Sequence, residues 1–195
     1  MPRNGFFGVK NSHIATFKDE GTFTFNKPVH IPGTVEIKMD RSIETATSYA
    51  DNEVWLESKQ DNGGSGTISF YDTESTPELR ELFAELVGFD IDADGHVLDT
   101  SGKDPKPFAY MAEQPGKVVS KRRCWYKCTL TPPSLDAKTL EEKPDITRLD
   151  YGIKWVPVTL PTGWRGCSYT SYSDLDDYEN FFDAVKTDLT PKAGE

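Results

Sequence analysis

Several short runs of the chain alternate between apolar and polar residues, and this pattern restricts the possible folds more than any other feature. In residues 33–40, the side chains of Val35, Ile37 and Met39 alternate with those of Glu36, Lys38 and Asp40. Similar β-rich runs lie at 21–25, 66–72, 107–113, 124–130 and 149–158. A period of two is typical of strands that bury one face, as in antiparallel sheets. The sequence therefore predicts a mainly β fold.

One helix is predicted at residues 75–88, where the apolar residues follow helical spacing. Ser75 and Thr76 are candidate caps, Pro77 lies in the first turn, and Gly88 ends the segment. Its apolar stripe occupies one side only, so we expect this helix to lie on the sheet.

A second helix is predicted at 173–186, with Ser173 as its cap and Lys186 at its far end. A C-terminal tail, 187–195, follows it. The glycine-rich segment 60–66 separates two strand-like runs and predicts the flexible turn of a hairpin.

Composition indicates one acidic domain spanning 1–195. The net charge of −10 argues against a protein that grips nucleic acid, because neutralising phosphates requires basic residues. No apolar run approaches the length of a membrane span, and no signal peptide is evident, so we expect synthesis in the cytoplasm and no membrane contact.

The three cysteines do not suggest a disulfide framework, because their number is odd and low. Cys124 and Cys128 would share one face of a regular strand, too far apart to bridge. We expect buried or half-buried free thiols. Nucleophile elbows, phosphate loops and zinc-ligand spacings are lacking. The sequence therefore predicts a non-enzyme without catalytic residues, cofactors or metal.

The segment 89–102 imitates half of a calcium-binding loop. Asp90, Asp92, Asp94 and Gly95 match the first half of an EF-hand, but Ser101 stands where the bidentate glutamate belongs. The prolines that follow exclude an exit helix. We interpret the segment as an acidic turn without a functional calcium site.

Two further segments suggest contacts. The basic and aromatic run 121–127 is interpreted as a sheet edge or a contact with an acidic neighbour. The connection 131–145 is too long and too polar for a compact core, so we expect it to order against another subunit. Its candidate contact residues are Pro132, Pro133, Leu135, Lys138, Leu140, Glu141, Glu142 and Lys143.

The order of these segments resembles the major tail protein, or tail tube protein, of long-tailed bacteriophages with non-contractile tails. The resemblance spans roughly residues 5–186. It is carried by the runs GVKNSHIATF, IPGTVEI, SYADNEVWLES, GTISFYD, PELRELFAELVGF, PFAYMAE, KRRCWYKCTLTPPS, AKTLEEKPDITRLDYGIKW and DDYENFFDAV. In SYADNEVWLES, a Tyr-Ala-Asp stretch precedes a turn.

The resemblance implies a tail-tube type antiparallel β-sandwich or barrel, with one helix packed on it, a long intersubunit loop and a C-terminal helix. It also implies hexameric rings that stack into a hollow tube in the virion tail, through which phage DNA passes without specific binding. Implied partners are further copies, the tail-terminator protein, and the tail-tip and tape-measure proteins. In such a tube, we expect Glu36, Lys38 and Asp40 to face the lumen, where a net negative wall repels phosphate.

Other functions stay open. One is a monomeric β-sandwich module that binds carbohydrate or protein through some of Trp55, Trp125, Trp155 and Trp164. Another is a hydrolytic enzyme with paired carboxylates in a deep pocket. A third is a calcium-binding module at 90–101.

Overall fold

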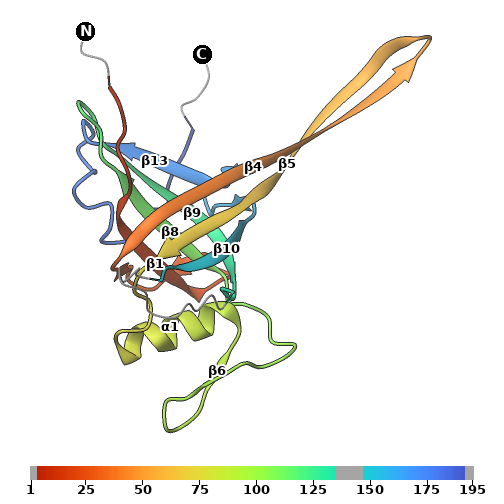
Figure 1. Cartoon of the computed structure of the whole chain (residues 1–195). Coiled ribbons are helices and arrows are strands. Elements are labelled where there is room, and N and C mark those ends of the chain that lie inside the picture. The colour runs from red at the N-terminus through yellow and green to blue at the C-terminus, as the bar shows by residue number, and fades with distance from the viewer. Residues whose placement is uncertain (1–3, 135–146, 192–195) are drawn as a thin grey trace, which may run out of the picture.

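A nine-stranded antiparallel sheet forms the body of the protein in a computed structural model that describes residues 4–134 and 147–191 (Figure 1). The elements are β1 Lys10–Asp19, β2 Thr24–Phe25, β3 Val29–Ile31, β4 Thr34–Ala50, β5 Glu53–Phe70, α1 Pro77–Val87, β6 Asp90–Ile91, β7 Val97–Leu98, β8 Phe108–Gln114, β9 Lys121–Thr131, β10 Leu149–Trp155, β11 Val158–Thr159, β12 Arg165–Gly166 and β13 Ser168–Tyr172. The sheet order is β2-β1-β8-β9-β10-β5-β4, with β3 paired to β1 and β13 to β9. The pairs β6-β7 and β11-β12 form two small separate sheets.

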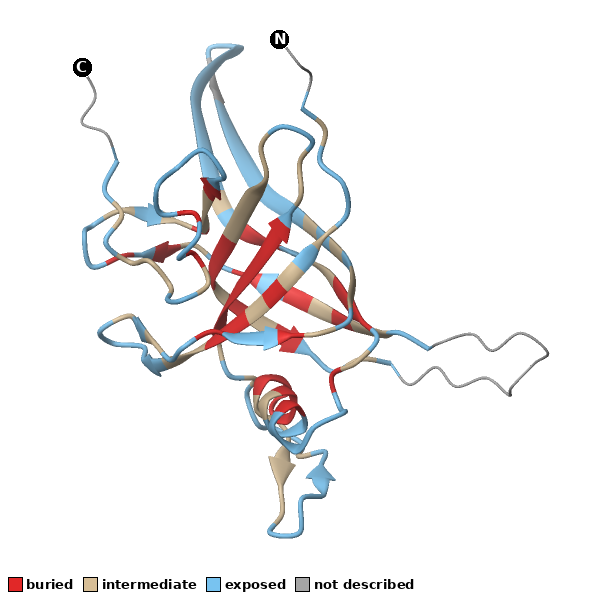
Figure 2. Ribbon diagram, turned by 90° about the vertical axis from the view of Figure 1, so that its left-hand side faces the viewer, coloured by how far each residue is buried: buried red, intermediate tan, exposed pale blue. Residues whose placement is uncertain are grey.

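The sheet is open but strongly curled, so that β1 and β4 approach each other although they are far apart in the strand order. A main core fills the concave side, where Phe70, Tyr110 and Ile153 are buried. A second core around Met111 and Tyr126 lies on the other face of β8 and β9. Figure 2 shows buried residues concentrated in the middle of the sheet and on α1. The predicted fold class, mainly antiparallel β of the sandwich type with a packed helix, is confirmed.

Helix α1 forms where the capping signals predicted a helix. The Thr76 side chain accepts a hydrogen bond from the backbone N–H of Leu79 at 3.3 Å, and Gly88 ends the helix with a left-handed backbone conformation. Leu79, Phe83 and Leu86 pack into the main core. Within the described residues, no helix is long and apolar enough to cross a membrane.

The predicted C-terminal helix at 173–186 is wrong. Residues 173–184 form successive turns, in which backbone N–H groups of Leu175, Tyr178 and Phe181 each bond to the carbonyl three residues earlier. This repeat of three brings Tyr178 and Phe181 onto the sheet. A period of three resembles the helical period of 3.6 over so short a segment, which explains the error.

The predicted turn at 60–66 is also wrong, because this segment lies inside β5. The β4-β5 hairpin turns at Asp51 and Asn52, whose φ values of 52° and 64° are typical of a tight hairpin turn. The glycines instead permit close packing. A Cβ on Gly66 would lie 1.9 Å from the Lys38 carbonyl oxygen, and one on Gly64 would lie 2.2 Å from the Trp155 ring.

An irregularity in β9 places Cys124 and Cys128 on opposite faces. Phe108 pairs with Cys128 and Tyr110 with Trp125, so β9 holds one extra residue between these pairs. Cys124 therefore packs in the second core and Cys128 in the main core, and the prediction of a shared face is wrong. Both thiols and that of Cys167 are buried and free, as predicted.

Candidate interaction surfaces

The β4-β5 hairpin extends far beyond the sheet as a two-stranded arm (Figure 1). β10 pairs with β5 only from Gly64 to Phe70. Beyond that point, the strand residues within 43–61 form β-pairs only with each other among the described residues. We call residues 43–61 the arm.

The arm exposes large apolar side chains. Trp55 is 76% exposed, and Ile43, Val54 and Leu56 are each more than half exposed. Leu56 pairs with Ser48 and Val54 with Tyr49, which leaves Trp55 as an extra residue in the strand. Such a bulge changes the direction of a side chain, and here it marks the most exposed tryptophan of the chain. Exposed apolar side chains of this size are typical of a binding surface.

The arm is also acidic. It carries one basic residue, Lys59, against the acids Glu44, Asp51, Glu53, Glu57 and Asp61. The Lys59 amine lies 3.2 Å from Glu57, so this single cation is already paired. The arm therefore fits a partner surface that is both apolar and basic.

Asp61 anchors the arm where it leaves the body. Its carboxylate pairs with Arg41, accepts the backbone N–H of Gly63 at 3.1 Å, and lies 3.7 Å from the Cys167 sulfur. The hydrogen bond from Arg41 lowers the pKa of Asp61 below its usual value. These contacts join β4, β5 and the segment before β13, and so restrict the direction of the arm.

The end of the sheet at which the chain begins carries a second apolar surface. Phe7 donates its N–H to the Pro115 carbonyl at 2.8 Å, and Lys117 donates to the Gly5 carbonyl at 3.0 Å, so the N-terminal segment lies along the β8-β9 connection. The Lys121 amine lies 4.1 Å from the centre of the Phe6 ring. Phe6, Phe7 and Val118 are 42%, 63% and 50% exposed. We call Phe6, Phe7, Lys117, Val118 and Lys121 the terminal patch.

A buried ion network lies close to this patch. Glu113 receives hydrogen bonds or ion pairs from Asn11 at 3.0 Å, Lys10 at 3.1 Å and Arg122 at 3.0 Å. Burial alone would raise the pKa of Glu113, but these bonds outweigh burial and hold the pKa below its usual value. The Arg122 guanidinium stacks 3.9 Å from the Tyr178 ring centre, and so attaches the C-terminal turns to the sheet.

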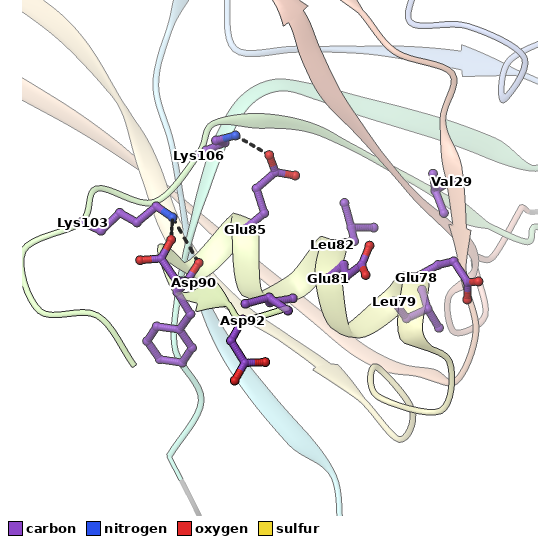
Figure 3. A pocket seen from close by; sticks show the side chains of 12 residues that line it. Val29, Glu78, Leu79, Glu81, Leu82, Glu85, Asp90, Asp92, Lys103 and Lys106 are labelled. Atoms are coloured by element: carbon purple, nitrogen blue, oxygen red, sulfur yellow. Dashed lines mark hydrogen bonds and ion pairs between the residues drawn. The ribbon is translucent and has the colours of Figure 1, made fainter. Parts of the chain in front are cut away.

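An open groove of about 690 Å³ runs beside α1 (Figure 3). Apolar side chains such as Leu82 line it, and its two lysines are paired: Lys103 with Asp90 and Lys106 with Glu85. The hydrogen bond from Lys103 lowers the pKa of Asp90. A carboxylate-pair hydrolase uses one ionised carboxylate and one proton donor, and a lowered pKa suits only the ionised member, so the hydrolase stays an alternative prediction.

The acidic segment after α1 is the turn of the β6-β7 hairpin. One Asp92 oxygen accepts the backbone N–H groups of Asp94 and His96 at 3.0 and 2.8 Å, and the other lies 2.8 Å from the His96 ring. Asp92, Asp94 and His96 are exposed and close enough to share an ion, whereas Asp90 is separate from this group. An exposed cluster whose central carboxylate already bonds its own turn is not by itself a metal site.

No protein-family model matches the chain, and no curated protein matches it significantly. Among solved structures, a chain of the anti-feeding prophage cap, described as a tube-terminating cap, aligns at 10% sequence identity and a TM-score of 0.42. That alignment covers 83% of this chain and 87% of the cap chain. A similarity of this size is too weak to assign a function.

The predicted lumen residues lie side by side on β4. Glu36, Lys38 and Asp40 are exposed, whereas Ile37 and Met39 pack toward the main core. Lys38 lies 3.5 Å from Asp40, and Glu36 lies 3.5 Å from Arg148. The two faces of this strand are therefore as predicted, and the destination of the exposed face stays a prediction.

Most of the predicted loop site lies outside the described residues. Pro132 and Pro133 follow directly after β9. Leu135, Lys138, Leu140, Glu141, Glu142 and Lys143 are not described.

The arm was missed because its strands read as two separate elements in sequence. Glycines at 63, 64 and 66 suggested a break, and regular alternation is seen only after them, at 67–70, whereas residues 57–61 are all polar. The turn itself was expected, because the resemblance places one after the Tyr-Ala-Asp stretch, and the Asp51-Asn52 pair forms it with its preference for positive φ. Of the four tryptophans, Trp125 and Trp155 are buried and Trp164 is half-buried, so they do not form a shared binding surface with Trp55.

Proposed function

We propose that the chain is a structural protein of a bacteriophage tail that assembles with copies of itself, as stacked hexameric rings, into a tube for DNA delivery. Two things support the proposal. One is the ordered resemblance of its segments to tail tube proteins, and the other is the arm.

The arm is the observation that carries the proposal. A two-stranded hairpin is at best marginally stable in water without further packing. Here it exposes Trp55 and its apolar neighbours on two strands that, among the described residues, have no further strand beside them, which would promote uncontrolled aggregation in a protein that worked alone. Contact with a neighbouring molecule removes both problems, because it buries the apolar side chains and supports the strands.

The remaining parts of the proposal rest on the resemblance to tail tube proteins. DNA passes through the lumen without specific binding, and Glu36, Lys38 and Asp40 face that lumen. Tail-terminator, tail-tip and tape-measure proteins contact the tube, and the chain itself performs no catalysis and holds no cofactor. It is made in the host cytoplasm and resides in the virion.

The arm can be removed without touching the core, which gives a direct test. Ile43 pairs with Asp61, so an Asn-Gly turn can replace residues 44–60 and join the two strands. The shortened protein should fold, as judged by circular dichroism, and sediment as a monomer under conditions in which the wild type forms large assemblies. Wild-type assembly by the shortened protein would refute the role of the arm.

The lumen assignment has its own test. Changing Glu36 and Asp40 to Lys should permit assembly but slow DNA ejection, most clearly at low salt, where charges are least screened. Glu36→Gln with Asp40→Asn is the control for lost ion pairs, because it removes charge without adding a cation. A tube structure with these residues on its outside would exclude the lumen assignment while leaving the tube intact.

The alternative is a monomeric binding module whose arm holds a different protein. The same exposed Trp55 favours it. Sedimentation separates the two functions, because such a module stays monomeric at every concentration.

A further inference from the structure

We infer that the arm of one copy binds the terminal patch of a second copy, with Trp55 packing against Phe6, Phe7 and Val118. This inference rests on the proposed self-assembly and names the surface that receives the arm.

Both surfaces expose apolar side chains, and contact between two copies would bury them. On the arm these are Val54, Trp55 and Leu56, and on the patch they are Phe6, Phe7 and Val118. Exposed aromatic residues on both sides are typical of the centre of an interface, where a few large side chains provide most of the binding free energy.

The charges of the two surfaces are opposite. The arm carries an excess of acids around Trp55, including Glu53 and Glu57. Residues 115–123 contain two lysines and two arginines and no acid. Arg122 is committed to the buried Glu113, whereas Lys117 and Lys121 belong to the terminal patch itself. Complementary charge of this kind orients two surfaces and disfavours wrong pairings.

Contact must occur between copies, because the arm projects away from the N-terminal segment of its own molecule (Figure 1). Two other exposed basic residues, Lys154 and Arg165, have one large exposed apolar residue near them in sequence, Val156, whereas the terminal patch has three. Two exposed acids, Asp174 and Asp176, follow β13 near the terminal patch. The apolar residues therefore supply most of the contact, and the lysines select its orientation.

Charge reversal in the full chain tests this pairing. Glu53→Lys with Glu57→Lys reverses the arm, and Lys117→Glu with Lys121→Glu reverses the patch. Each pair should raise the protein concentration needed for assembly, measured by sedimentation, at least about tenfold. A chain with all four changes should recover most of the loss. The matched control is Lys154→Glu with Arg165→Glu, which should change assembly little.

The outcomes distinguish this inference from the proposed function. If both charge-reversed variants still form tubes like the wild type, or if the chain with all four substitutions does not recover assembly, the pairing is wrong. Tube assembly would remain supported in either case. The wild type could instead form small closed oligomers that each double reversal abolishes and the chain with all four substitutions recovers. That result would support the pairing and exclude the tube. A wild type that stays monomeric at every concentration would overturn both.

Discussion

Replacement by Ala should have opposite effects on folding and on assembly at two tryptophans of this chain. Trp55 is 76% exposed on the arm, whereas Trp155 is 4% exposed at the end of β10, beside Gly64. Changing each to Ala separates the energetics of the fold from those of assembly.

The expected magnitudes follow from burial. Trp155→Ala removes a large side chain from the main core, which costs about 3–5 kcal/mol of the free energy of unfolding. At roughly 2–4 °C per kcal/mol for a domain of this size, the melting temperature should fall by about 6–20 °C. Trp55→Ala removes few contacts within the molecule, so its free energy of unfolding should change by less than about 0.5 kcal/mol.

Assembly should show the reverse order. Trp55→Ala should prevent or strongly weaken assembly, whereas Trp155→Ala should still assemble well below its melting temperature. Calorimetry on dilute monomer and sedimentation of concentrated protein measure the two properties separately. A Trp55→Ala variant that melts at as low a temperature as Trp155→Ala, or that assembles like the wild type, would contradict these expectations.

Three further predictions concern the body of the protein. Gly66→Ala should destabilise the fold by at least about 2 kcal/mol, because its Cβ would meet the Lys38 carbonyl oxygen, whereas the exposed Ser65→Ala should change little; equal melting temperatures would contradict this. Glu113→Gln should destabilise by about 2 kcal/mol or more at neutral pH, because it leaves Arg122 without its buried partner. The pKa of Glu113 is lowered in the folded state. Its contribution to the free energy of unfolding is therefore complete above the ordinary carboxyl pKa of 4.5 and is lost as pH falls through the folded-state pKa. A stability difference between wild type and Glu113→Gln that persists undiminished in acid would contradict the assignment. Calorimetry with calcium should detect no site tighter than about 10⁻⁵ M, and a tighter site that disappears in Asp92→Asn would show that the acidic turn binds the ion.

Local signals predicted the parts of the fold that local chemistry determines. Thr76 and Gly88 marked both ends of α1, and the alternation around Ile37 predicted which face of β4 is buried. These features depend on residues close together in sequence, so the sequence pattern was sufficient to predict them.

The wrong predictions, a turn at 60–66 and a helix at 173–186, share a cause. In both segments the local sequence allows more than one backbone conformation, and packing against the rest of the protein selects one of them. Gly64 and Gly66 are typical of turns, but in β5 they make room for Trp155 and the Lys38 carbonyl. Tyr178 and Phe181 have nearly helical spacing, yet contact with the sheet favours successive turns. The terminal patch joins residues far apart in sequence, so no single motif could predict it.

Cryo-electron microscopy of the purified wild-type protein at increasing concentration tests the central proposal most directly. We expect hollow tubes of stacked six-membered rings, with each arm ordered against a neighbouring subunit. Particles that remain single 21.9 kDa chains at every concentration would contradict it.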